Sequence, residues 1–155
     1  MKKVLCTNLT LLTSAGTEYA PMKLTSEYNE TEDVTVYEIT LTYSGQSYSV
    51  QGDNFSFTQA FVSLEKSLAE DVKIASCLTC RHGNLCPYCG GDDEVFCTKD
   101  LIIRDKTDMC NLFNSEDDQC GSRLVRPFDY CGNFVRQSDD YYTYNDFLYY
   151  LRNSI

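Results

Sequence analysis

The chain has 155 residues, enough for one domain with a sizeable buried core, or for a core with an appended cysteine-rich module. Its formal net charge is −10, with five basic and ten acidic residues in 1–76 and eight basic and thirteen acidic residues in 77–155. Nucleic-acid binding depends on basic patches that neutralise phosphates. The even excess of acid therefore disfavours a nucleic-acid partner and favours a protein partner, in particular a basic one.

The hydrophobic pattern and the cysteine count bear on where the protein is found. No run approaches the ~20 apolar residues of a membrane-spanning helix, so we expect no membrane partner. The first sixteen residues resemble a signal peptide only faintly, because Asn8 and three threonines interrupt the apolar stretch. There are nine cysteines, an odd number, whereas a secreted disulfide framework needs an even one. We therefore predict a cytoplasmic, bacterial protein whose cysteines are reduced.

The N-terminal third predicts strands and a long connection. Residues 3–12 alternate leucines with other side chains, as in a strand, and Cys6 on the opposite face is expected to be a buried small apolar residue. Residues 13–33 are rich in turn formers and acidic side chains. They predict a surface loop that contains at most a short strand near 22–24.

A hairpin and a helix are predicted next. Residues 34–43 alternate apolar and polar side chains, and the turn at 44–45 leads into a partner strand at 46–51. A helix is predicted from Ser56 to about Glu70, with a capping box of Ser56 and Gln59 and a hydrophobic staple of Phe55 and Ala60. Its apolar face comprises Phe57, Ala60, Phe61, Leu64 and Leu68. Residues 1–76 thus predict a small antiparallel sheet with one packed helix.

Eight of the nine cysteines lie between Cys77 and Cys131, and two close pairs open this stretch. Cys77-Leu-Thr-Cys80 and Cys86-Pro-Tyr-Cys89 each supply two thiols from one turn. A tetrahedral structural zinc site needs four such soft ligands at about 2.3 Å. Two pairs so close together indicate bound Zn²⁺, as one or two ions, with disulfides as the main alternative and an iron–sulfur cluster as a further one.

The arrangement of these motifs resembles an uncharacterised bacterial family of small cysteine-containing proteins. The matching elements are Cys77-Leu-Thr-Cys80, Pro87-Tyr88, Phe96-Cys97 and Tyr130-Cys131-Gly-Asn-Phe134. The resemblance covers about residues 74–134 and implies a first metal site of Cys77, Cys80, Cys97 and Cys131. The family has no known activity.

Four cysteines depart from the family pattern and suggest a second site. Cys86 and Cys89 flank the Pro-Tyr turn, and Cys110 and Cys120 are additional. We therefore consider a second metal site formed by Cys86, Cys89, Cys110 and Cys120. The alternative is a single site, with these four cysteines serving other purposes.

The remaining polar residues argue against catalysis. His82 is the only histidine and is expected to be exposed in the loop between the ligand pairs. General bases at neutral pH are most often histidines, and catalytic zinc usually has histidine ligands and an open position. We therefore expect a structural thiolate site, no catalytic residues and no enzyme activity.

The C-terminal part is predicted to be mostly irregular until its end. Residues 100–109 predict a short strand and residues 111–121 a loop. A closing helix is predicted after Thr143, which would cap it, with Phe147, Leu148 and Leu151 packed inward. The whole chain is therefore predicted to be α+β, with residues 77–155 forming a cysteine-rich zinc-binding module that ends in a helix. We expect this module and residues 1–76 to form one compact unit.

Three functions fit these patterns. The first is a non-enzymatic zinc-stabilised protein-interaction module, of the immunity-protein or antitoxin kind, that binds a basic protein. The second is a thiol redox protein that uses one Cys-x-x-Cys pair. The third is a zinc-knuckle nucleic-acid-binding module, which would require Arg81, Arg104, Arg123, Arg126 and Arg136 to gather on one face.

Overall fold

The computed structural model describes residues 1–88, 90–115 and 120–153, so Cys89 lies outside the described part. The chain forms two compact units, Met1–Ala75 and Ser76–Ile155. The first unit is an antiparallel sheet with one helix, and the second combines a small sheet with short helices. The predicted α+β class and the antiparallel sheet are confirmed.

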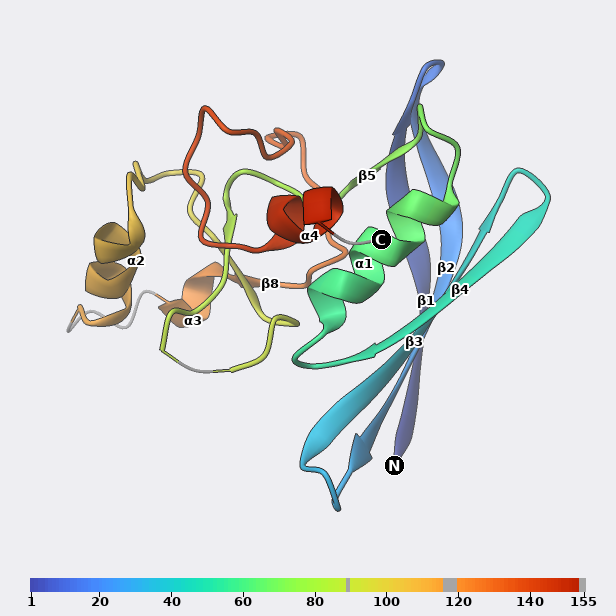
Figure 1. Cartoon of the computed structure of the whole chain (residues 1–155), viewed down its shortest axis with the longest axis horizontal. Helices are drawn as coiled ribbons and strands as arrows, with labels where there is room; N and C mark the ends of the chain where they lie inside the picture. Colours follow the sequence, from blue (N-terminus) through green and yellow to red (C-terminus); the bar gives the residue numbers. More distant parts are fainter. Residues whose placement is uncertain (89, 116–119, 154–155) are drawn as a thin grey trace. The chain divides into compact units, whose positions relative to one another are not determined.

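The first unit contains a five-stranded sheet in the order β4-β3-β2-β1-β5. Its strands are β1 (Lys2–Thr13), β2 (Gly16–Asn29), β3 (Val34–Tyr43), β4 (Gln46–Asp53) and β5 (Lys73–Ala75). Strands β1 to β4 follow one another as antiparallel hairpins, and β5 pairs with Thr10–Leu12 of β1 on its other side. Figure 1 shows the helix α1 (Phe57–Ser67) lying across one face of this sheet.

The prediction of a surface loop at 13–33 is wrong, because β2 occupies most of that range. Its inward side chains Ala20, Met22 and Leu24 are buried, while the alternating positions are polar or exposed. A proline such as Pro21 is unexpected in a central strand, because it has no N–H to donate. The ladder between β2 and β3 ends at Met22, however, so Pro21 lies just beyond it.

The core of the first unit lies between α1 and the sheet. Phe57, Phe61 and Leu64 of the helix are fully buried, as are Leu11 and Leu41 of the sheet. The Phe57 ring also meets Tyr37 of β3 edge to face, with ring centroids 5.0 Å apart. The predicted apolar face of the helix is therefore confirmed.

The predicted start of this helix is wrong in its details. Ser56 occupies the N-cap position, but its hydroxyl makes no capping bond to the helix. Instead it donates to the carboxylate of Asp53 and accepts from the Asp53 amide, because the strand and helix are joined by a tight turn. Phe55 is 62% exposed and so forms no hydrophobic staple.

Cys6 also differs from expectation. The structure exposes this thiol, which lies on the sheet face opposite Leu9 and Leu11. Its neighbours across the ladder on that face include Lys23, a charged residue. Since α1 covers only one face of the sheet, the alternation of β1 places Cys6 on the solvent side.

The second unit is built from short elements. A three-stranded sheet has the order β6-β7-β8, and the helices are α2, α3 and α4. Their bounds are β6 (Gly83–Asn84), β7 (Val95–Cys97), β8 (Leu124–Val125), α2 (Lys106–Phe113), α3 (Cys120–Arg123) and α4 (Phe147–Asn153). Its most buried side chains include Leu78, Val95, Met109 and Phe147.

One strand prediction and the capping of one predicted helix need correction in this unit. The strand predicted at 100–109 is absent from these residues, because α2 begins after Asp105, whose side chain accepts from the Asp108 amide at 3.0 Å. The closing helix is confirmed, but Thr143 does not cap it. Asn145 holds its first turn instead, because the side-chain oxygen accepts from the Phe147 amide at 2.8 Å.

The loop predicted at 111–121 is interrupted at both ends, since α2 continues to Phe113 and α3 begins at Cys120. Residues 116–119 lie outside the described part. No helix in the described ranges is both long and apolar enough to cross a membrane.

Candidate metal centre

Four cysteines line one small cavity in the second unit. Cys77, Cys80, Cys97 and Cys131 surround a space of about 20 Å³, close to the size of a single water molecule. These are the four residues that the family resemblance implies as a first metal site. They come from three stretches that are well separated in the sequence.

Local backbone structure explains how the first two thiols meet. The chain turns tightly after Cys77, because the amide of Cys80 donates to the Cys77 carbonyl and the amide of Gly83 donates to the Cys80 carbonyl. The N–H of His82 then points at the Cys80 sulfur, with 3.5 Å between nitrogen and sulfur. Such an N–H group stabilises negative charge on a cysteine sulfur.

Gly83 allows this turn to sit against β7. A Cβ atom on Gly83 would lie 1.8 Å from the carbonyl oxygen of Cys77 and 3.1 Å from the Val95 side chain. Only glycine avoids this overlap. Gly83 also pairs with Cys97 in the ladder of β6 and β7, so the close approach brings the third cysteine beside the first turn.

The C-terminal part of the chain holds the cysteine turn from the other side. The backbone amides of Cys77 and Leu78 donate to the carbonyls of Asp129 and Pro127, at 2.7 and 3.0 Å. Cys80 forms an isolated antiparallel bridge with Arg136. These bonds place the loop that carries Cys131 next to the turn that carries Cys77.

One asparagine joins the closing segment to both ends of the same turn. The side-chain amide of Asn145 donates to the carbonyl of Leu78 at 2.8 Å and to that of Gly83 at 2.9 Å. Thr143 adds a bond from its hydroxyl to the Arg81 carbonyl at 2.7 Å. The buried loop thus obtains partners for its carbonyl groups from the C-terminal segment.

Burial controls the protonation of the two thiols in the turn. Burial raises the pKa of Cys77 to about 12, and the charges of Asp129 and the other three cysteines act in the same direction. Burial also raises the pKa of Cys80, although hydrogen bonds from the backbone of Val135 and His82 oppose the increase. Without a nearby cation, Cys77 is therefore protonated at neutral pH.

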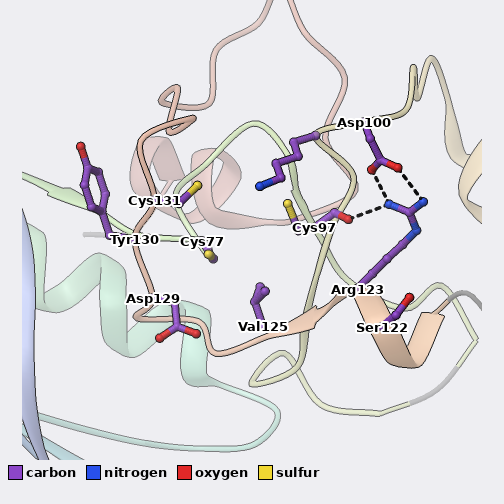
Figure 2. A pocket seen from close by; sticks show the side chains of 10 residues that line it. Cys77, Cys97, Asp100, Ser122, Arg123, Val125, Asp129, Tyr130 and Cys131 are labelled. Atoms are coloured by element: carbon purple, nitrogen blue, oxygen red, sulfur yellow. Dashed lines mark hydrogen bonds and ion pairs between the residues drawn. The ribbon is translucent and has the colours of Figure 1, made fainter.

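A larger hollow opens beside the thiols. It has a volume of about 540 Å³ and is lined by Cys77, Cys97 and Cys131 together with charged residues. Figure 2 shows these three side chains around the hollow and Arg123 paired with Asp100 at its edge. Arg123 also donates to the Cys97 carbonyl at 3.1 Å, so this ion pair helps fix the end of β7.

His82 differs from the exposed loop residue that the sequence predicts. It is half-buried and lines the thiol cavity. Burial lowers its pKa, and the neighbouring charges of Arg81 and Lys99 add to this effect. Its ring meets Tyr141 edge to face, and its Nδ1 atom has no hydrogen-bond partner among the described residues.

The residues considered for a second site are only partly brought together. Tyr88 lies near both Cys86 and Cys110, because its amide donates to the Cys86 sulfur at 3.4 Å and its hydroxyl interacts with Cys110. The Cys120 thiol donates to the carbonyl of Leu112 on α2 at 3.7 Å. Cys89 falls outside the described residues, so this grouping remains a prediction.

The four thiols of the first site are not arranged as a coordination sphere. Within the described ranges, no three His, Cys, Asp or Glu side chains are placed so that they could hold a metal ion. The first four thiols share a cavity, but their sulfurs would have to turn toward a common point.

Comparisons with family models, curated proteins and solved structures found no match to this chain. The resemblance to the uncharacterised bacterial family is therefore neither confirmed nor refuted.

Proposed function

We propose that the protein is a non-enzymatic protein-interaction module whose second unit is stabilised by Zn²⁺ bound to Cys77, Cys80, Cys97 and Cys131. The observation that carries the proposal is the single cavity lined by these four thiols. Four sulfur donors are typical of a structural zinc site, which uses soft ligands and leaves no open position.

The surroundings of the thiols fit such an ion. The N–H of His82 points at the Cys80 sulfur, as expected for a turn that stabilises a thiolate. Lys99 lines the same cavity, so its positive charge would offset part of the negative charge of a zinc ion with four thiolates. Binding of the ion would require the four side chains to rotate about their Cα–Cβ bonds, so that the sulfurs face a common point. The ion would then tie β7 and the loop of Cys131 to the first turn.

A second ion at Cys86, Cys89, Cys110 and Cys120 is part of the same proposal. Its support is that Tyr88 interacts with both Cys86 and Cys110, through its amide and its hydroxyl respectively. A chain with both sites filled would carry two zinc ions, and a chain with the first alone would carry one.

The charge distribution supports a protein partner over a nucleic acid. Arg104, Arg123 and Arg126 form ion pairs with Asp108, Asp100 and Asp129. Arg152 pairs in the same way with Asp139. These ion pairs neutralise arginine side chains that would otherwise be available to bind the phosphates of a nucleic acid. The net charge of −10 instead favours the binding of a basic protein. An immunity protein or antitoxin in the cytoplasm of a bacterium fits this description.

The thiol redox function is less well supported. A redox-active cysteine needs a lowered pKa, so that the thiolate is present at neutral pH. Burial instead raises the pKa of Cys77 to about 12 in the protein without metal. The first Cys-x-x-Cys pair is thus better suited to a structural ion than to thiol exchange.

Native mass spectrometry combined with elemental analysis tests the metal. We expect one or two zinc ions per chain and no iron, and the bound thiols should react with an alkylating reagent only after chelation. Visible colour after anaerobic purification would indicate that the cysteines bind an iron–sulfur cluster and not zinc. Metal-free protein with freely reactive thiols would refute the proposal.

Co-purification tests the interaction. The tagged protein should retain a basic partner that, once purified separately, rebinds with a defined stoichiometry. Weaker binding at higher salt is expected, because the attraction between the two proteins is electrostatic. Recovery of the monomer alone would count against an interaction module while leaving the zinc site intact.

A further inference from the structure

A second cavity, in the first unit, is unrelated to the cysteines. It has a volume of about 360 Å³ and lies where the β1–β2 turn, the β3–β4 turn and the loop after α1 meet. Its lining includes two carboxylates, Glu18 and Asp71, and the phenol side chains of Tyr43 and Tyr48. None of the described residues that line it is a lysine, an arginine or a histidine.

Both carboxylates are fixed by hydroxyl groups of the same cavity. Tyr43 donates to Glu18 Oε2 at 2.6 Å, and Ser14 donates to Asp71 Oδ2 at 3.0 Å. A carboxylate offers about four acceptor positions, so each group retains capacity for a further donor. The two anions are thus oriented at the cavity without a cation from the described residues that line it.

The pKa of Tyr43 is raised by both carboxylates of the cavity. The hydrogen bond to Glu18 raises the pKa of Tyr43, and burial and the charges of Glu18 and Asp71 raise it further. Tyr48 lines the same space, and its hydroxyl is held by the side chain of Gln46 at 2.8 Å. The cavity therefore combines negative charge with aromatic rings.

We propose that this cavity binds the guanidinium group of an arginine side chain presented by a basic protein partner. A guanidinium is planar, stacks on aromatic rings and has five N–H donors, which suit two carboxylates and neighbouring phenols. A hard metal ion such as Ca²⁺ would need six to eight oxygen ligands, whereas only two carboxylates line this cavity.

The location favours a side chain from a macromolecule. The cavity is bordered by Ser14, Ala15 and Ser44, which lie in exposed hairpin turns and leave it accessible to a large partner. The inference rests on the proposed function in one respect, the basic protein partner. It does not depend on zinc.

The test uses the ¹⁵N-labelled full chain as purified, titrated with N-acetyl-arginine amide. We expect saturable chemical-shift changes confined to the amides around the two turns and near Asp71. N-acetyl-citrulline amide, which has a similar shape without the charge, should cause none. Equal shifts with both compounds, or no saturable shift with arginine, would overturn the proposal.

Matched variants separate a specific site from general attraction. Asp71→Asn and Glu18→Gln should each weaken arginine binding about tenfold or more, since each removes one charge-assisted bond. Glu38→Gln changes the net charge equally, but Glu38 lies outside the cavity and accepts a bond from Gln51. It should bind arginine like the unmodified chain. If it weakens binding as much as Asp71→Asn, the site is not specific.

The two proposals fail in different ways. If the purified chain contains no zinc but still binds arginine, the metal centre alone is refuted. Absence of arginine binding in a chain that contains zinc and retains a basic partner would refute the cavity assignment alone. If a purified basic partner is found, Asp71→Asn should weaken its binding more than Glu38→Gln does. Equal effects would show that the partner does not use this cavity.

Discussion

The cysteine turn leaves no room for a side chain at position 83, where the residue is glycine. The Cα of Gly83 approaches the Cys77 carbonyl so closely that any side chain would overlap with backbone, which cannot move aside as a flexible side chain can. This close contact holds β6 against the turn that carries Cys77 and Cys80. The proposed metal centre therefore depends on a residue that would not itself bind the ion.

We predict that Gly83→Ala destabilises the second unit by more than about 3 kcal/mol, because backbone overlap is costlier than ordinary overpacking. Urea unfolding with zinc present measures the effect. Gly132→Ala is a matched control, since no atom lies within 4 Å of the methyl group that alanine would add there and its backbone φ is not in the left-handed region. Equal stability of both variants would contradict the prediction.

Replacement of a thiol tests the same site directly. Cys77→Ser and Cys97→Ser should each lower the melting temperature strongly and reduce the zinc content by one ion, because metal binding is coupled to folding. Cys6→Ser is the control, since Cys6 is exposed in the first unit. An unchanged melting temperature for Cys77→Ser would argue against a structural ion at this place.

At the scale of elements, polar side chains join segments by binding the backbone of a distant element. Glu65 of α1 is 3% exposed, and its Oε1 accepts from the Ile74 amide of β5 at 2.8 Å. The bond fixes the short edge strand at the end of the helix. Asn145 has a corresponding role in the second unit, where it joins the closing segment to the cysteine turn.

We predict that Glu65→Ala destabilises the first unit by about 2–3 kcal/mol, because it removes a buried hydrogen bond between α1 and β5. Glu65→Gln retains an acceptor oxygen and should cost less. Glu70→Ala, at an exposed position just after the helix, should change the unfolding free energy by less than about 0.5 kcal/mol. Denaturant unfolding compares the three variants, and equal losses for Glu65→Ala and Glu65→Gln would contradict this role.

For the whole molecule, the two units differ in what stabilises them. The first has a continuous core of large apolar side chains between α1 and the sheet. The second has strands of only two or three residues and helices of at most eight within the described ranges. Short elements bury little surface, so a bound ion is expected to matter much more in the second unit.

Removal of the metal should therefore affect the units unequally. After chelation, we expect the amides of residues 77–84 and 95–98 to lose protection from hydrogen exchange, while those of β1 to β3 keep it. Hydrogen exchange followed by mass spectrometry measures both regions in one experiment. Equal protection before and after chelation would mean that any bound ion is not structural.

The affinity for zinc should increase with pH. Cys77 is protonated at neutral pH in the metal-free protein, because burial raises its pKa to about 12. Zinc has to displace thiol protons, so binding should release protons and strengthen between about pH 6 and pH 8. Competition with a chromophoric chelator measures the affinity at each pH. If the affinity does not change with pH, the ion is not coordinated by thiols that are protonated in the metal-free protein.

Local patterns along the chain were enough to predict β3, β4, the apolar face of α1 and the closing helix, because each has a clear period or turn signal. They were not enough for β2 or α2. Pro21 and the polar face of β2 imitate a loop, and it takes neighbouring strands on both sides to show that the segment belongs in a sheet.

The sequence by itself determined that eight of the nine cysteines lie in the second half and that four of them form two Cys-x-x-Cys pairs, since such pairs can be recognised locally. The grouping of Cys77 and Cys80 with Cys97 and Cys131 had only a family resemblance behind it. The tertiary structure decided that these four thiols share a cavity, because backbone bonds between distant segments bring them together. It alone revealed Glu18 and Asp71 in one cavity, since no spacing rule links a strand residue to a loop so far along the chain.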